Sequence, residues 1–158
     1  MVYAAYGLGR VVTRQHQLVR GVEQEVVVLE FEDGLTVSLP LARAHEQLRA
    51  LASEPEIGRV QEMLRDRGAV SKQPWLARQR QAQAKLTGGE PLGLAEIVRD
   101  GAVRQRSLTA KGAKPELSDG ERRVFLKARQ LLSNEIGQVR SLSATEADHW
   151  IDQQLAST

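Results

Sequence analysis

Positively charged side chains are concentrated in the middle of this 158-residue chain. Residues 71–114 carry nine lysines and arginines but only three acidic residues, whereas the net charge of the whole protein is +2. These basic residues are Lys72, Arg78, Arg80, Lys85, Arg99, Arg104, Arg106, Lys111 and Lys114. A basic segment in an otherwise nearly neutral protein indicates an anionic partner. The solvated surface of a helix would carry the same charges, so the charge pattern leaves both interpretations open.

The residue types that catalyse reactions or bind metals form no recognisable constellation. His16, His45 and His149 are not spaced as H-x-x-x-H or H-E-x-x-H pairs, and the chain has no cysteine. Neither G-x-S-x-G, a phosphate-binding loop nor a complete G-x-G-x-x-G occurs. Glu56 and Glu121 each end an S-x-x-E sequence, which favours helix capping over general acid catalysis. We therefore predict that the protein is not an enzyme and has no metal and no cofactor.

The composition is that of an ordinary globular chain, with 41% hydrophobic and 27% charged residues. Aromatic residues make up 4%, so the core must be aliphatic. There is no apolar run of about 18 residues and no signal-peptide pattern, so we expect a cytoplasmic protein without a membrane span.

The first fifty residues have the pattern of a small, strongly bent β-sheet. Strands are predicted at 9–14, 24–31 and 35–39, because these segments are rich in β-branched residues and are separated by turn signals. The turn signals are Arg20-Gly21 and Asp33-Gly34, and the second is typical of a type I′ hairpin with two positive φ angles. Pro40 ends the third strand. The segment therefore predicts a Tudor-like or SH3-like small β-barrel.

After Pro40 the apolar residues recur at helical spacing. Three capping boxes, beginning at Ser53, Ser118 and Ser143, each predict the start of a helix. Two further helices are predicted to begin near Pro74 and Pro91. Glycines mark helix ends at Gly68 and at 88–89, whereas Gly101 lies inside a helix and should weaken it. The fold class is therefore α+β, with an N-terminal barrel (residues 1–48) and a C-terminal bundle of about five helices (residues 49–158).

Five stretches, in this order along nearly the whole chain, resemble the CarD family of bacterial RNA polymerase-binding transcription regulators. The first resembles the family's V-Y start with a bending glycine, and the second resembles its third-strand signature. The third is a tryptophan-plus-basic helix, the fourth an A-E-V-V-R-D helix, and the fifth the family's longest shared block. In this chain they are 2–7, 35–40, 74–80, 95–100 and 117–132.

The resemblance implies a division of labour between the two parts. The Tudor-like domain would bind the β subunit of RNA polymerase, and Arg10, Arg14, Arg20 and Ser38 are the candidate polymerase-binding residues. In relatives the positions of Ser38 and Gln17 are usually basic, which is a departure here. An exposed sheet edge offers a physical route, because it can extend a partner's sheet through main-chain hydrogen bonds.

The resemblance also implies that the helical domain touches promoter DNA at the upstream edge of the transcription bubble. Trp75 matches the family's tryptophan wedge in the minor groove, and Arg78 and Arg80 would hold phosphates. Lys127 matches a DNA-contacting position in the fifth stretch. We expect weak, largely sequence-independent DNA binding by a monomer, and stabilisation of the open complex.

Other interpretations compete with this one. Taken without the resemblance, Trp75 is more typical of a core residue. The helical domain could instead recruit another protein and leave DNA untouched, in which case the polymerase-binding protein would be an adaptor. A buried Trp75 would favour the adaptor, whereas an exposed Trp75 beside the arginines would favour DNA contact. A free-standing RNA-binding barrel is disfavoured by the acidic balance of residues 1–50 and the scarcity of aromatic residues.

Overall fold

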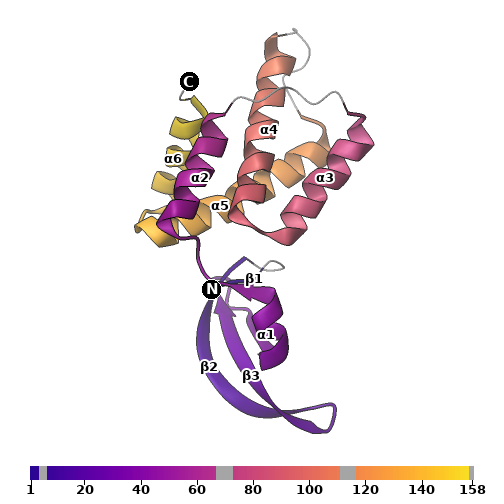
Figure 1. The fold of residues 1–158 in the computed structure, drawn as a ribbon, viewed down its shortest axis with the longest axis vertical. Helices are drawn as coiled ribbons and strands as arrows, with labels where there is room; N and C mark the ends of the chain where they lie inside the picture. Colours follow the sequence, from indigo (N-terminus) through magenta and orange to yellow (C-terminus); the bar gives the residue numbers. More distant parts are fainter. Residues whose placement is uncertain (4–6, 67–72, 111–116, 157–158) are drawn as a thin grey trace. The chain divides into compact units, whose positions relative to one another are not determined.

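The computed structural model describes residues 1–3, 7–66, 73–110 and 117–156. It divides into two compact units, Met1–Leu51 and Ala52–Thr158. The first contains a small antiparallel sheet and the second a bundle of helices (Figure 1). The predicted α+β class is confirmed.

In the part of the N-terminal unit that the structure describes, five strands form an antiparallel sheet with strand order β4-β3-β2-β1-β5. Its elements are β1 (Val2–Tyr3), β2 (Gly7–Val19), β3 (Val22–Phe31), β4 (Thr36–Pro40), the short helix α1 (Leu41–Gln47) and β5 (Leu48–Arg49). The three predicted strands are present, and the first is longer than predicted. Strands β2 and β3 form a long curved hairpin that extends beyond the end of β4 (Figure 1).

The two predicted hairpin turns are present, but the type I′ geometry occurs at Arg20-Gly21 and not at Asp33-Gly34, where it was predicted. Arg20 and Gly21 have φ angles of 53° and 78°, so this two-residue loop has the paired positive φ angles of a type I′ turn. At the second turn only Gly34 has a positive φ, 85°, and the Asp33 carboxylate accepts a hydrogen bond from the Leu35 N–H at 3.0 Å. The type I′ prediction for Asp33-Gly34 is therefore wrong, because the loop there is longer than two residues.

A β-bulge and one glycine shape the sheet. The pairing of β2 with β3 shifts register between Val11 and Thr13. Before the bulge, Gly9 lies opposite Phe31, and a Cβ atom at Gly9 would be 2.7 Å from Cε1 of the Phe31 ring. Glycine therefore lets the ring pack against the bent strand. Phe31 joins the core of this unit, with Val27, Leu29, Leu39 and Ala44.

The described residues of the C-terminal unit form five helices, as predicted: α2 (Glu54–Arg65), α3 (Trp75–Gly88), α4 (Pro91–Ala110), α5 (Asp119–Arg140) and α6 (Ala144–Ala156) (Figure 1). Its aliphatic core is contributed mainly by α2, α4, α5 and α6, and includes Ile57, Val98, Ala128, Ile136 and Ile151. Helix α3 contributes only partly buried side chains. It is the least deeply packed of the five.

The helix ends follow the sequence signals closely. The Ser53, Ser118 and Ser143 hydroxyls each accept a hydrogen bond from the backbone N–H three residues later. Gly89 ends α3 with a φ of 68°. The predicted stop at Gly68 lies outside the described residues.

Gly101 does not interrupt α4, which continues to Ala110. The Phe125 ring of α5 lies where a Gly101 side chain would be. This glycine therefore serves a close approach of two helices rather than merely weakening one.

Candidate nucleic-acid interface

Trp75 stands at the start of α3, directly after Pro74, whose φ of −56° leads the chain into the helix. It is 46% exposed, and its neighbour Leu76 is 53% exposed. The indole Nε1–H donates to the Ser118 hydroxyl at a donor–acceptor distance of 3.4 Å. One edge of the ring is thus held against the beginning of α5, while nearly half of the side chain faces solvent. Trp75 is therefore not a core residue. A buried Trp75 would have favoured the adaptor interpretation, and the side chain is exposed instead.

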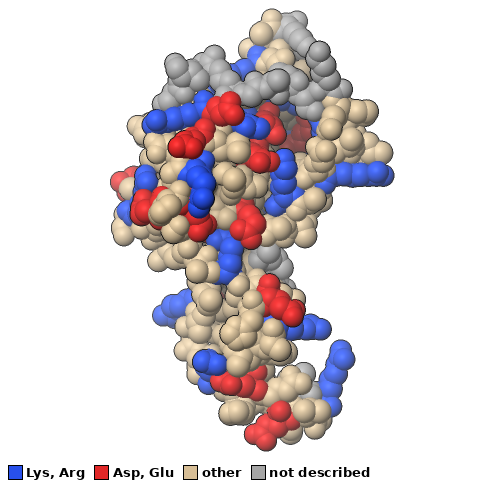
Figure 2. Space-filling model, viewed as in Figure 1, with Lys and Arg blue, Asp and Glu red and all other residues tan. Residues whose placement is uncertain are grey.

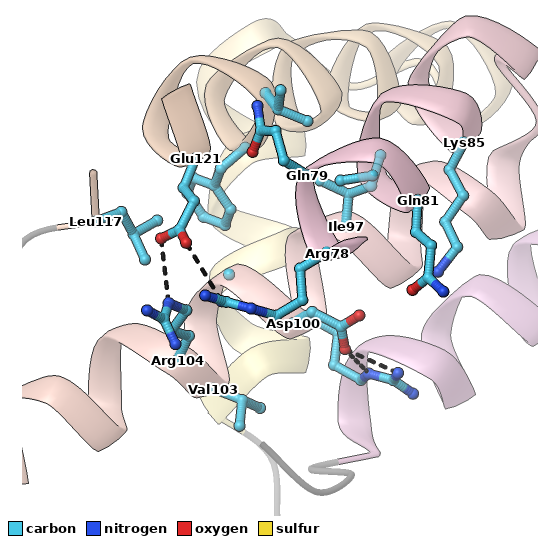
Figure 3. A pocket seen from close by; sticks show the side chains of 15 residues that line it. Arg78, Gln79, Gln81, Lys85, Ile97, Asp100, Val103, Arg104, Leu117 and Glu121 are labelled. Carbon is cyan, nitrogen blue, oxygen red and sulfur yellow. Dashed lines mark hydrogen bonds and ion pairs between the residues drawn. The ribbon is translucent and has the colours of Figure 1, made fainter. Parts of the chain in front are cut away.

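Arg78 is oriented differently from the solvent-facing arginine that the sequence suggested. Its Nη1 lies 3.2 Å from Oε1 of Glu121, whose other oxygen accepts a hydrogen bond from the Arg104 Nε at 3.1 Å (Figure 3). The three side chains are 19%, 13% and 31% exposed for Arg78, Glu121 and Arg104 respectively. We call them the Arg-Glu-Arg network. It links α3, α5 and α4. The proposed phosphate contact of Arg78 stays a prediction, since its guanidinium faces Glu121 here.

The same contact revises the expected role of Glu121. Its backbone N–H does donate to the Ser118 cap, but its carboxylate turns to the two arginines instead of reaching back to the cap. In a complete capping box the glutamate carboxylate also accepts a hydrogen bond from the backbone N–H of the capping serine. This second hydrogen bond is present at the last capping box, where the Glu146 carboxylate accepts from the Ser143 N–H at 3.0 Å. This hydrogen bond and that with the serine hydroxyl lower the pKa of Glu146.

Arg80 and Lys127 are exposed, and neither has an ion-pair partner within the described ranges. Arg80 is five residues beyond Trp75 and therefore about 140° around the helix, on the outer side with Leu76. Lys127 is seven residues after Gly120, close to two full turns, so it shares a side of α5 with Gly120. A Cβ at Gly120 would lie 3.7 Å from the Trp75 ring. Lys127 thus follows Trp75 along one side of α5.

Sequence reasoning missed one basic residue on this side of α5. Arg123 is exposed and lies three residues after Gly120 and four before Lys127. The i, i+3 and i, i+4 spacings place the three positions in a row. That spacing can be read from the sequence. It indicates a basic row beside the tryptophan only once the structure shows that Gly120 lies against the Trp75 ring.

Within the described residues, the basic side chains in the middle of the chain do not form one basic patch; Lys72, Lys111 and Lys114 lie outside these residues. Lys85 pairs with Glu96, Arg99 pairs with Asp66 and Asp100, and Arg106 donates to the carbonyl of Leu155. On the face drawn in Figure 2, basic and acidic side chains of the helical unit are interspersed. Much of the charge that suggested an anionic partner is therefore used to join helices to one another.

The four residues predicted to bind polymerase do not share one face of the sheet. Arg10 lies opposite Glu30 and pairs with it at 3.6 Å, whereas Arg14 lies opposite Val27, a core residue on the other face. The bulge between Val11 and Thr13 causes this change, because an even spacing of four residues would otherwise keep both arginines on one face.

Ser38 and Arg20 lie at the rim of the sheet. Ser38 is exposed on the edge strand β4 opposite Val28, on the same face as Arg10. Arg20 is exposed at the tip of the long hairpin, in the β2–β3 turn.

Neither a metal site nor a membrane-spanning helix is found among the described residues. No group of three or more His, Cys, Asp or Glu side chains in these ranges could hold a metal ion. No described helix is both long and apolar enough to cross a membrane.

Comparison with known families covers almost the whole chain. Residues 1–52 match the family model described as the CarD-like/TRCF RID domain. Residues 59–152, more than half of the protein, match the model described as CarD, C-terminal domain.

Proposed function

Because the chain belongs to the CarD family of transcription-associated regulators that interact with RNA polymerase, we propose that it stabilises the promoter open complex. The domain matched by residues 1–52 implies an interaction with the polymerase β subunit, and the family's domains are non-enzymatic. In this proposal the β unit binds polymerase and the helical unit places Trp75 in the minor groove at the upstream bubble edge.

The exposure and anchoring of Trp75 carry the proposal. Inserting an apolar side chain between base pairs costs a few kcal/mol of unstacking, and this cost is smallest where the duplex is already opening. A wedge there binds the open state more tightly than the closed state, and only such a difference shifts the equilibrium. The hydrogen bond to Ser118 restricts the ring before DNA arrives, which lowers the entropy lost on binding.

Basic side chains near Trp75 support weak contacts to phosphate. Lys127 and Arg123 follow the tryptophan along α5, and Arg80 lies on the outer side of α3. Three such contacts give salt-sensitive, non-specific affinity. Attachment to polymerase raises the effective concentration of the helical unit at the promoter, so weak contacts suffice.

The edge of β4 supports the polymerase contact. Within the described residues β4 pairs with β3 alone, so its other edge can receive a strand from a partner. Ser38 lies on this strand, and Arg10 lies on the same face two strands away. We therefore favour Arg10 and Ser38 over Arg14 as polymerase-contacting residues, because Arg14 lies on the opposite face.

Site-specific crosslinking tests the proposed geometry. A photoreactive phenylalanine analogue at position 75, in a polymerase–promoter complex, should crosslink to DNA at the upstream bubble edge. The same analogue at Leu92, an exposed apolar residue of α4, is the control and should give at most background DNA crosslinking. Crosslinks from position 75 to protein alone would support the adaptor and contradict the wedge.

A further inference from the structure

Helix α3 is attached to the bundle by polar contacts and by the partly buried side chains of Ala82 and Leu86. None of its described residues is fully buried. It is held by the Arg-Glu-Arg network, by a hydrogen bond from the Gln79 side chain to the Gly120 carbonyl at 3.4 Å, and by an ion pair between Lys85 and Glu96. A helix that carries an exposed tryptophan thus has no fully buried apolar side chain among its described residues, although Ala82 and Leu86 pack against the core.

A cavity of about 220 Å³ lies between α3, α4 and α5 (Figure 3). Its apolar walls include Ala82, Ile97, Val124 and the ring of Phe125. Because Gly101 has no side chain, the aromatic ring lies close against α4 and forms one wall. The cavity is smaller than the ~300–1,000 Å³ pockets that hold drug-sized ligands, so it suits a single ring rather than a large cofactor.

Cationic side chains outnumber carboxylates among the residues that line the cavity, but Lys85 also pairs with Glu96 and Arg99 with Asp66, both outside the lining. Four cationic side chains line the cavity, and the described lining has two carboxylates, Asp100 and Glu121; the cations are Arg78, Lys85, Arg99 and Arg104. Both carboxylates already face arginines. Arg78 and Arg104 share Glu121, and two buried atoms of this network, Arg78 Nε and Glu121 Oε1, have no hydrogen-bond partner within the described part of the chain. Since two guanidinium groups share one carboxylate, the network carries a net positive charge.

We propose that the cavity beneath α3 binds a compact aromatic anion. The ring would lie against Phe125 and Ile97, which would bury apolar surface that the helices leave unfilled. The anionic group, a carboxylate or a phosphate, would accept charge-assisted hydrogen bonds from the guanidinium groups at the Arg-Glu-Arg network. Neither the family assignment nor the proposed DNA contact requires such a ligand.

A bound ligand would fix α3 against α4 and α5. Trp75 is one turn before Arg78 and Gln79 on the same helix, so its position depends on how α3 is seated. Any effect on DNA rests on the proposed function, whereas binding itself does not. The test therefore uses the protein alone, without polymerase or DNA.

Titration of the full chain, followed by amide NMR shifts, tests the proposal with benzoate, phenyl phosphate and neutral benzamide as probes. We expect at least one of the two anions to cause saturable shifts at amides of the α3, α4 and α5 residues that line the cavity. Benzamide should bind about tenfold more weakly, because a charge-assisted hydrogen bond becomes a neutral one. The tighter of the two anions identifies the anionic group.

Three variants separate the cavity from the surface. Ala82→Leu fills the cavity and should abolish the saturable shifts. Lys85→Gln removes one lining cation, and should weaken binding about two- to fivefold even if Ala82→Leu does not fold. Arg59→Gln removes an exposed cation of α2 outside the cavity and should leave binding unchanged. Equal binding of benzamide, equal losses in Arg59→Gln and Lys85→Gln, or shifts that do not saturate would overturn the proposal.

Discussion

The Arg-Glu-Arg network lets us predict how much stability the protein loses when Glu121 is replaced. Replacing it by glutamine keeps the size of the side chain and one acceptor oxygen, but removes the charge that two arginines share. Breaking a fully buried ion pair costs about 3–5 kcal/mol. Since the three side chains remain 13% to 31% exposed and one acceptor is kept, we expect Glu121→Gln to lower the free energy of unfolding by about 2–3 kcal/mol.

Thermal and urea unfolding, followed by circular dichroism, measure this loss. For a helical unit of this size, one kcal/mol corresponds to roughly 4 °C in Tm, so the expected drop is about 8–12 °C. Glu96→Gln is the matched control. It breaks the pair of Glu96 with Lys85, whose side chains are 29% and 37% exposed, and should cost about 0.5 kcal/mol.

A double variant tests the coupling directly. In Arg78→Gln/Glu121→Gln the unpaired charge on Arg78 is removed together with its partner, so the double loss should be about 1 kcal/mol smaller than the sum of the single losses. If Glu121→Gln costs no more than Glu96→Gln, or if the two losses simply add, the network does not hold α3 and the reasoning is refuted.

Two further predictions concern helix packing and pH. Gly101→Ala should destabilise the protein by about 1–3 kcal/mol because its methyl group would overlap the Phe125 ring, whereas Gly58→Ala in α2, with open space around it, should stabilise by about 0.5–1 kcal/mol; equal signs in urea unfolding would contradict this. The Ser143 N–H and hydroxyl lower the pKa of Glu146, so its contribution is present above the ordinary pKa and is lost as pH falls through the lowered folded value. Glu146→Gln should therefore flatten stability below about pH 4.5, and an unchanged acid limb of the Tm–pH profile would argue against the cap.

The orientation of α3 shows how much of the site could be predicted from the sequence. Helix bounds follow from Pro74 and Gly89, and the period of 3.6 residues places Arg78 on the side of Ala82 and Leu86. Helical periodicity in the sequence therefore indicates that Arg78 faces the bundle and that Arg80 does not. The pairing of Arg78 with Glu121 could not be predicted, because it joins residues 43 positions apart.

The β unit shows a different limit. Alternation along a strand places Arg10 and Arg14 on one face, and the bulge after Val11 places them on opposite faces. A bulge depends on cross-strand pairing, which no local pattern reveals. Gly101 is similar, since its effect on α4 depends on a ring in another helix.

The lifetime of the open complex in a Trp75→Ala variant tests the central claim most directly. With purified polymerase and one promoter, the variant should be retained on polymerase like the wild type while the open complex dissociates about tenfold faster, as expected from losing an aromatic contact to a base worth roughly 1.4 kcal/mol. Leu92→Ala, another exposed apolar residue of the helical unit, should behave as the wild type. Full retention with an unchanged lifetime in Trp75→Ala would contradict the wedge and leave the protein as a polymerase-binding adaptor.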